Sequence, residues 1–230
     1  MTFLAARQAR LVMLAMFYAM TAPATIITGE LHITGSVRIG ADFADFIPLG
    51  GATGDFNVEP TSTGSFVALV DPGPSDDGDI LDLNAGNAPV NVLFSLPNFL
   101  TFDLDPTVTF ELEFVEPGAF SPCPVGLPVA CSINQFNLVQ TGSSVVANFN
   151  VLGEVHSGAD VSSFTGSFSH VFTSRTIASL LTQIGTNGFI DTPFDGDFVV
   201  TPEIPEPSTI AMLGIGLGFL CIASVRRKRR

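Results

Sequence analysis

Basic side chains are confined almost entirely to the two ends of this chain, and this placement constrains its architecture more than any other feature. Of the 9 lysines and arginines, two lie within the first ten residues and five form the last five positions, so only Arg38 and Arg175 stand between them. All 22 aspartates and glutamates fall between Glu30 and Glu206. With two arginines against 22 carboxylates, the body has a formal charge of −20 between two positive ends.

An acidic body excludes one large class of partners. Affinity for nucleic acid depends on lysines and arginines that neutralise phosphates, so we expect no nucleic-acid binding. The only lysine is Lys228, in the basic C-terminal run. The body can therefore hold neither a P-loop lysine for phosphate nor a Schiff-base lysine.

Residues 1–24 have the pattern of a secretory signal peptide. Two arginines supply a charged start, and the apolar run at 11–20 is 10 residues long, within the length of about 7–15 typical of such segments. Ala22 and Ala24 supply the small residues of a cleavage site, so Thr25 is the expected first residue of the mature protein. A buried helix of a cytosolic domain is the alternative, but it leaves the cleavage pattern unexplained.

A second apolar segment lies near the C-terminus. Residues 208–225 contain no charged side chain, and a basic run at 226–230 follows at once. These 18 residues span about 27 Å as a helix, close to the hydrocarbon thickness of a bilayer. The positive-inside rule keeps the basic run in the cytoplasm, so the body is expected on the other side. A nuclear-import or nucleic-acid-binding run is the alternative, but no spacer separates these residues from the apolar segment.

Three features of this end, in this order, are a Pro-Glu-Pro box, a glycine-containing hydrophobic helix and an arginine-rich end. Together they resemble the PEP-CTERM sorting signal of Gram-negative bacteria, over about residues 203–230. The residues of the box and of the basic end are Pro205, Glu206, Pro207, Arg226, Arg227, Lys228, Arg229 and Arg230.

The resemblance implies recognition by an exosortase, a membrane cysteine transpeptidase, which removes the tail. The protein would be exported, held transiently in the inner membrane by its C-terminal helix, and delivered to the cell surface or extracellular matrix. Exopolysaccharide is a partner that this setting suggests. The same tail is also catalogued as an ice-binding protein C-terminal domain, a label that is no evidence for ice binding by the body.

The chain is therefore expected to have five parts. They are a signal peptide (1–24), an extracytoplasmic domain (25–200), a linker with the Pro-Glu-Pro box (201–207), a transmembrane helix (208–225) and a basic cytoplasmic tail (226–230).

The extracytoplasmic domain is predicted to be all-β, because short runs of alternating or β-branched residues are separated by Gly, Pro, Asp and Asn. Residues 107–114 show the clearest alternation, with Val108, Phe110, Leu112 and Phe114 on one face. The predicted strands are 30–39, 65–70, 90–96, 99–104, 107–115, 133–140, 144–155, 163–173 and 197–201. Short strands at this spacing favour a β-sandwich or a jelly-roll-like body.

Two segments of the body depart from this pattern. Residues 176–184 have helical spacing, with Ile177, Leu180 and Ile184 on one face, and Gly185 is the expected end of this one short helix. Residues 71–91 are rich in acidic residues, Gly and Pro, and are predicted to form a long loop.

The body has two cysteines, Cys123 and Cys131, on either side of a segment rich in Pro and Gly. In an exported protein, a pair at this spacing indicates a disulfide that closes a loop. Half of a metal site is the alternative, but no nearby histidine or third cysteine supports it. Cys221 lies in the apolar tail and is expected to be lost with it.

The hydrolase, zinc and nucleotide-binding signatures are absent from the sequence. It has no G-x-S-x-G elbow and no H-E-x-x-H pair. His32, His156 and His170 lie far apart in strand-like surroundings, which is typical of ordinary surface or edge residues. We therefore expect a non-enzymatic protein, with a secreted hydrolase that uses a carboxylate pair as a distant alternative.

Calcium is the one metal that the acidity suggests, because it binds several carboxylate and carbonyl oxygens on turns. The candidate ligands are Asp76, Asp77 and Asp79 in the predicted acidic loop. They do not follow the EF-hand order, and a solvated acidic loop explains them equally well. No cofactor is otherwise expected.

The aromatic composition argues against a carbohydrate-binding face. The chain has no Trp, and its only Tyr is Tyr18 in the signal segment, whereas sugar-binding faces commonly stack such rings. The phenylalanines lie on predicted strands and fit a core better than an exposed platform. We therefore expect a surface or matrix protein first, and a calcium-dependent adhesion or polysaccharide-binding module as the alternative.

Overall fold

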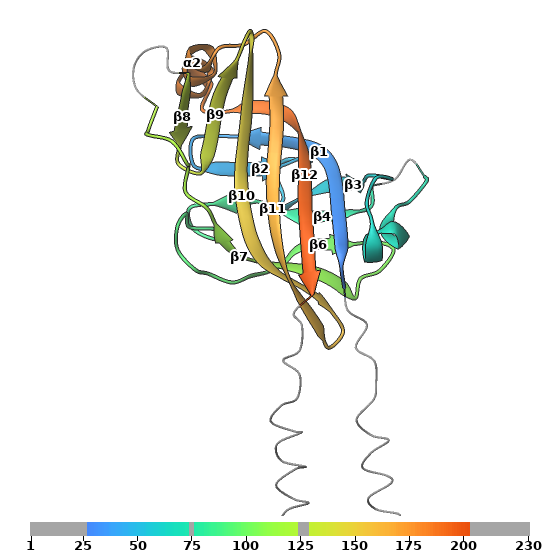
Figure 1. Ribbon diagram of the computed structural model, residues 1–230. Helices are drawn as coiled ribbons and strands as arrows, with labels where there is room; N and C mark the ends of the chain where they lie inside the picture. Colours follow the sequence, from blue (N-terminus) through green and yellow to red (C-terminus); the bar gives the residue numbers. More distant parts are fainter. Residues whose placement is uncertain (1–26, 74–75, 124–128, 203–230) are drawn as a thin grey trace, which may run out of the picture.

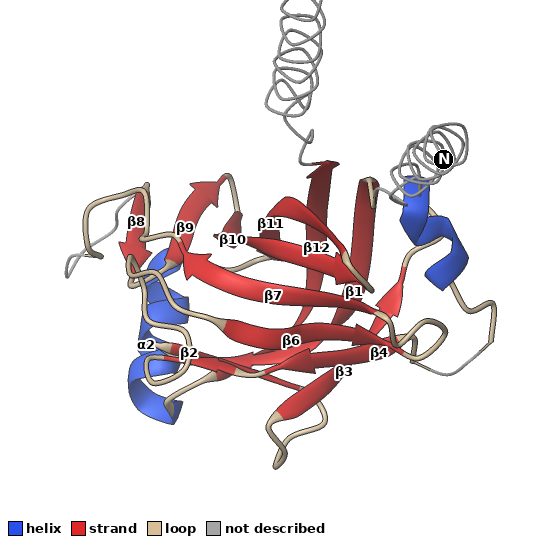
Figure 2. Cartoon of the chain, turned by 90° about the horizontal axis from the view of Figure 1, so that it is seen from below, coloured by secondary structure: helices blue, strands red, loops and turns tan. Residues whose placement is uncertain are grey.

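The computed structural model describes residues 27–73, 76–123 and 129–202. Strands dominate these residues, and one short α-helix accompanies them (Figures 1 and 2), so the prediction of an all-β body with one helix is confirmed. The signal segment, the Pro-Glu-Pro box, the apolar segment and the basic tail lie outside the described residues.

The strands are β1 (Gly29–Ile39), β2 (Phe43–Phe46), β3 (Thr53–Val58), β4 (Gly78–Leu81), β5 (Leu83–Asn84), β6 (Leu96–Phe102), β7 (Val108–Val115), β8 (Ala130–Ile133), β9 (Phe136–Thr141), β10 (Ser144–Ser157), β11 (Asp160–Phe172) and β12 (Ile190–Pro202). The helices are the 3₁₀-helix η1 (Gly64–Leu69) and the α-helix α2 (Ile177–Asn187).

The described strands form one sheet that closes on itself. Eight strands follow one another in the order β11-β12-β1-β3-β4-β6-β7-β10, and the ring is completed because β10 also pairs with β11. Strands β9 and β8 extend the sheet beyond β10, while β2 and β5 are attached to β1. The all-β body therefore consists of one closed sheet, whereas the sequence suggested the two packed sheets of a sandwich or jelly roll.

Strand β10 makes this closure possible because it has different partners along its length. One edge pairs with β11 from Val145 to Ser157, and the other pairs first with β9 and then with β7. The register shifts at Leu152 and Gly153, where β7 begins to run beside it. A Cβ on Gly153 would lie 2.0 Å from the carbonyl oxygen of Glu111, so only glycine allows the two backbones to approach this closely.

The long strands lie on one side of the molecule and the shorter ones cross behind them. In Figure 1, β10, β11 and β12 run side by side along the front, while β3, β4 and β6 pass behind them. The first and last strands are neighbours, since Gly29 of β1 pairs with Val200 of β12. The two ends of the described domain therefore lie together, and α2, β8 and β9 lie at the opposite end (Figure 1).

Phenylalanine fills the interior of the ring. The ring of Phe110 is fully buried and lies within 6 Å of four other rings, with centroid distances of 5.9 Å to Phe66, 5.9 Å to Phe102, 5.0 Å to Phe164 and 5.6 Å to Phe198. Most of these contacts are tilted or edge-to-face, the arrangements that aromatic quadrupoles favour. The sequence-based assignment of the phenylalanines to a core is supported by this packing.

A second, smaller apolar cluster lies beneath α2. Ile177 and Leu180 of the helix are buried in it beside Leu138, and the disulfide cysteine Cys131 lies in the same cluster. The helix begins with a capping box, in which the Thr176 hydroxyl accepts from the amide of Ser179 and the Ser179 side chain pairs with the amide of Thr176.

The helix agrees with the sequence-based prediction except at its end. It continues for three residues past the expected end, and Gly188, at φ 84°, takes the left-handed position that ends it. Gly185 was the wrong choice because it lies within the helix. A single glycine in a short amphipathic pattern does not by itself mark the end of a helix.

Two of the predicted strands were wrong. The predicted strand at 65–70 falls on η1 (Gly64–Leu69), in which Phe66 and Leu69 are both buried at the three-residue spacing of a 3₁₀-helix. Residues 90–95 form no strand beyond one bridge between Val90 and Val115, since Asn91 has a φ of 61° and Leu93 is 80% exposed. β-branched and other apolar residues indicated a strand in both segments. Burial of Phe66 and Leu69 favours a 3₁₀-helix in the first, and the left-handed conformation of Asn91 interrupts the second.

The predicted long loop at 71–91 was also partly wrong, because it contains β4 and β5. Ile80 and Leu83 are buried there, but acidic neighbours hide the alternation in the sequence. Strands β2, β3 and β8 were likewise not predicted, and β12 begins at Ile190 instead of 197. The predicted strand at 133–140 is interrupted by the turn between β8 and β9. In β12 the outward-facing residues include Asp191, Pro193 and Asp195, which look like turn residues in a sequence.

The phenylalanine cluster gives the first testable prediction. Phe110→Ala removes the ring at the centre of four aromatic contacts and should reduce the free energy of unfolding by about 3–5 kcal/mol. Phe120→Ala is the matched control, because Phe120 is 42% exposed and should cost far less. Denaturant unfolding of the full-length chain measures both, and equal losses for the two variants would contradict the assigned core.

Candidate functional site

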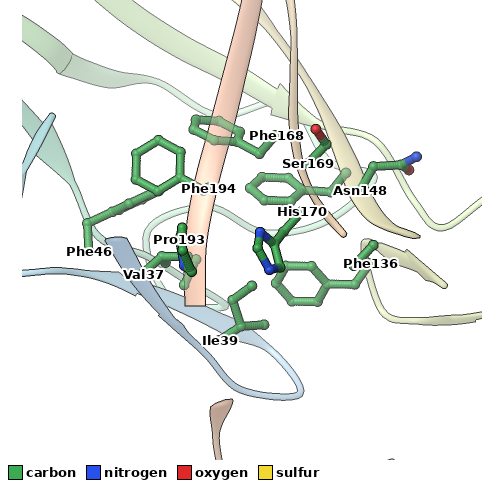
Figure 3. Close-up of a pocket in the computed structure, with 13 residues that line it drawn as sticks. Val37, Ile39, Phe46, Phe136, Asn148, Phe168, Ser169, His170, Pro193 and Phe194 are labelled. Atoms are coloured by element: carbon green, nitrogen blue, oxygen red, sulfur yellow. The ribbon is translucent and has the colours of Figure 1, made fainter. Parts of the chain in front are cut away.

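Two cavities in the described interior are too small for a substrate. The first lies among Phe46, Phe136, Phe149, Phe168 and Phe194 (Figure 3) and has a volume of about 20 Å³. The second, beneath α2, also has a volume of about 20 Å³. Each has room for about one water molecule, so both are packing gaps and not substrate pockets.

His170 lies at the border of the first cavity. Figure 3 shows its ring near Phe136 and Pro193, and the ring is edge-on to Phe172 at a centroid distance of 4.8 Å. Burial lowers the pKa of His170, while the nearby carboxylate of Asp195 acts in the opposite direction. The imidazole is therefore neutral at pH values where an exposed histidine would already be partly protonated.

The other two histidines lie on the outer face of the sheet and contact carboxylates. His32 Nδ1 lies 2.6 Å from Asp197 Oδ1, and its Nε2 lies 3.8 Å from Glu30 Oε2. His156 Nε2 lies 3.4 Å from Glu111 Oε2 and is the buried ring atom that lacks a hydrogen bond. These are contacts between histidine and acid, and not the pairing of a nucleophile with its base that covalent catalysis needs.

The acids around His156 arise from strand register. Glu154 of β10 pairs directly with Glu111 of β7, and Glu154 Oε2 lies 3.8 Å from His156 Nε2. Burial raises the pKa of Glu113, and the charges of Glu154 and Glu111 raise it further, while His156 lowers it. Like charges opposite one another destabilise a strand pair, so Glu111 and Glu154 oppose the pairing of β7 with β10 at this position.

Arg38 is one of the two arginines in the described residues, and it is paired. Its Nε and Nη2 donate to the two carboxylate oxygens of Asp191 at 2.7 and 3.0 Å, and its guanidinium lies 3.8 Å from the ring centroid of Phe189. The hydrogen bond from Arg38 lowers the pKa of Asp191. The charge of Arg38 is therefore used within the fold and is not offered to a ligand.

Among the calcium candidates, Asp77 has a structural role. It is 2% exposed, and its carboxylate accepts from the amide of Val58 at 2.6 Å and from the amide of Asp71 at 2.8 Å. Its backbone bonds to Phe56 on one side and to Asp103 on the other. Asp77 thus fixes the start of β4 against β3 and β6, which is a role that the sequence did not reveal.

Asp76 and Asp79 lie on either side of this buried residue and are both exposed. They do not meet Asp77 at one point, but both act on Asp55 of β3. Burial raises the pKa of Asp55 above its usual 3.8, and the charge and hydrogen bond of Asp76 and the charges of Asp79 and Asp103 raise it further. The result is a region of mutual repulsion between carboxylates.

No group of three or more His, Cys, Asp and Glu side chains placed to hold a metal ion is found among the described residues. The predicted calcium ligands Asp76, Asp77 and Asp79 are therefore close in sequence without forming such a group. Calcium binding stays a prediction that a direct measurement must test.

The predicted disulfide is present in the structure. Cys123 and Cys131 are bonded, and their Cα atoms are 4.7 Å apart. Because Cys131 is buried beneath α2, the bond ties Cys123 to the smaller apolar cluster. In the chain-entropy account, closing so short a loop contributes about 2–3 kcal/mol.

One feature of the outer face could not be found from sequence spacing. Strand register aligns Asn150 of β10, Ser167 of β11, Asp197 of β12 and His32 of β1 in a single row across four strands. Alternation within each strand showed which residues face outward. Which of them are neighbours depends on the register, for which no short-range signal exists.

Comparison with known proteins identifies only the C-terminal segment. Residues 203–230 match the family model of the PEP-CTERM protein-sorting motif, which confirms the resemblance inferred from the sequence. No curated protein and no solved structure matches the chain. The motif supports an exported protein with a membrane-associated sorting tail that an exosortase processes.

The described residues include no helix that is long and apolar enough to cross a membrane. The predicted transmembrane helix at 208–225 and the predicted cleavage residues Ala22 and Ala24 lie outside those residues.

The assigned role of Asp77 can be tested by substitution. Asp77→Asn replaces one buried acceptor oxygen by a donor that faces an amide, and should reduce the free energy of unfolding by about 1–3 kcal/mol. Asp76→Asn changes an exposed neighbour by the same charge and should leave stability unchanged or slightly higher. Thermal unfolding of the two variants should therefore separate them, and equal melting temperatures would contradict the role.

The raised pKa of Asp55 predicts a pH dependence. Because the folded state binds this proton at a higher pH than the unfolded state, the stabilising contribution is complete below about pH 3.8 and is lost as the pH rises through the folded pKa. Acidification from neutral pH should therefore stabilise the wild-type chain more than Asp55→Asn. Melting temperatures measured across this range give the difference, and parallel curves for the two proteins would refute the prediction.

Proposed function

We propose that this chain is a non-enzymatic exported protein whose acidic β-domain is delivered to the cell surface or the extracellular matrix by its sorting tail. The observation that carries the proposal is the match of residues 203–230 to the PEP-CTERM motif. An exosortase and the export machinery are its processing partners. The domain itself is the part that is delivered.

Features of the domain favour a role without catalysis. The two interior cavities described above hold about one water each. His32 and His156 contact carboxylates on the outer face, and His170 packs against aromatic rings. These arrangements give the described histidines structural and electrostatic partners in place of a substrate.

The position of the chain ends supports display from a tail. Gly29 and Val200 are paired, so the domain is entered and left at one end. The helix α2 and the strands β8 and β9 lie at the other end (Figure 1). A domain held by its C-terminal tail would therefore direct this second end away from the attachment point.

Two alternatives predict different experiments. A calcium-dependent adhesion or polysaccharide-binding module predicts a higher melting temperature with calcium than with a chelator. A secreted hydrolase predicts turnover of a glycoside by a carboxylate pair. Glu111 and Glu154 do lie near one another, but they stand on the outer face of the sheet around His156.

The sorting role gives the fourth prediction. Replacing Glu206 and Pro207 by alanine, or deleting residues 226–230, should stop tail removal and leave a membrane-associated precursor. The substitution Thr201→Ser serves as a control outside the motif and should be processed normally. Fractionation and intact-mass analysis in an exosortase-bearing host measure both products. Normal maturation of the motif variants would contradict the proposed sorting.

A further inference from the structure

The outer face of the sheet has a hollow that none of the roles above explains. Its volume is about 320 Å³, and it is open to solvent over β10, β11 and β12. That is about the lower end of the volumes at which proteins bind small groups. We call it the outer hollow; its lining includes Glu116, Asn150, Leu152, Thr165, Ser167, Asp197 and Val199.

One side of the outer hollow is a polar row. Asn150 pairs with Ser167, and Ser167 pairs with Asp197 on the next strand. Glu116 stands beyond the first residue, where its Oε2 accepts from the Asn150 side-chain amide at 2.8 Å. A carboxylate therefore lies at each end of this row, with an amide and a hydroxyl between them.

The other side is a mainly apolar row two residues further along the same strands. Leu152 pairs with Thr165, and Thr165 pairs with Val199, which is 46% exposed. The next partner across the sheet is Glu30. The outer hollow thus has an apolar side for a hydrocarbon chain and an acidic side for a positive charge.

Both carboxylates of the polar row are held in place before any ligand binds. Asp197 Oδ1 lies 2.6 Å from His32 Nδ1, and Glu116 is held by Asn150. Neither described arginine lines the outer hollow, and Arg38 is engaged with Asp191. No positive side chain of the hollow's lining competes for these two acids.

We propose that the outer hollow binds a lysine or arginine side chain of a basic peptide segment in a partner protein. The alkyl stem of such a side chain would lie along Leu152, Thr165 and Val199, and its cationic end would lie between Glu116 and Asp197. Long basic side chains bury their stems on apolar surface while the charge stays in water. The formal charge of −20 between Glu30 and Glu206 attracts such a segment over a distance and repels an anionic one.

The test uses the full-length chain in a non-ionic detergent and a dye-labelled pentalysine peptide, with fluorescence anisotropy as the readout. The double variant Glu116→Gln/Asp197→Asn should weaken binding by about two- to fivefold for each carboxylate removed, the range typical of exposed charge pairs. Raising the ionic strength from about 0.1 M to about 1 M shortens the screening length from about 10 Å to about 3 Å and should abolish binding.

The matched control is Asp42→Asn/Asp79→Asn, which also removes two negative charges. Asp42 is exposed just before β2, and Asp79 is exposed on β4. This control should change the affinity by less than about twofold. If both double variants weaken binding equally, only the net charge matters, and the proposal is wrong. Absence of pentalysine binding to the wild-type chain at low salt would also overturn it.

A third variant avoids the two carboxylates and the hydrogen bonds that hold them. Val199→Lys places a positive charge on the apolar side of the outer hollow at an already exposed position, so the fold should tolerate it. It should reduce binding at least as much as the carboxylate variant, whereas Val199→Thr should have a smaller effect. Unchanged affinity of Val199→Lys would refute the proposed site. None of these results bears on the sorting tail, so the two proposals can fail separately.

Discussion

Closing one sheet on itself directs alternate residues of every strand into a common interior, and that interior has to be filled. With eight strands in the ring, the interior is just wide enough for side chains to fill it. This chain fills it with phenylalanine, such as Phe110, whose ring touches four others. Phenylalanine side chains have no polar atom that needs a partner, so their rings can crowd this interior without adding a buried polar group.

The same closure places charged side chains on the outer face of the sheet. Because inward positions are apolar, the carboxylates of β1, β7, β10 and β12 occupy the outer face, where the register brings some of them together. Glu111 and Glu154 are paired in this way, and His156 lies against both. Within the described residues, histidine and Arg38 act as partners for carboxylates, since the chain has so few other cations.

Much of the fold could be inferred from local alternation, and the errors have physical causes. The strand near 107–115 was visible because every second residue is apolar, whereas the start of β12 was hidden by Asp191, Pro193 and Asp195 on its exposed side. Burial at a three-residue spacing made 64–69 a 3₁₀-helix despite its strand-like composition. Closure itself depends on the pairing of β10 with β7 and of β12 with β1 and β11, which join segments far apart in the sequence and which no local pattern contains.

The functional features also divide into those that a short segment of sequence contains and those that only the fold brings together. The sorting motif and the disulfide depend on residues close in sequence, so both could be predicted without a fold. The role of Asp77 could not, because its carboxylate binds an amide on another strand. The polar row from Asn150 to His32 unites four strands, and only the register reveals it.

The pairing of β12 on both edges has a mechanical consequence. Its antiparallel partners are β1, from Ile190 to Val200, and β11, up to Pro202. A pull on the end of this strand acts along its axis, so hydrogen bonds on both edges share the load and must break together. A strand loaded in shear in this way resists far more force than one peeled off pair by pair. An attachment at the C-terminal end therefore enters the domain through a strand whose geometry suits it to bear tension.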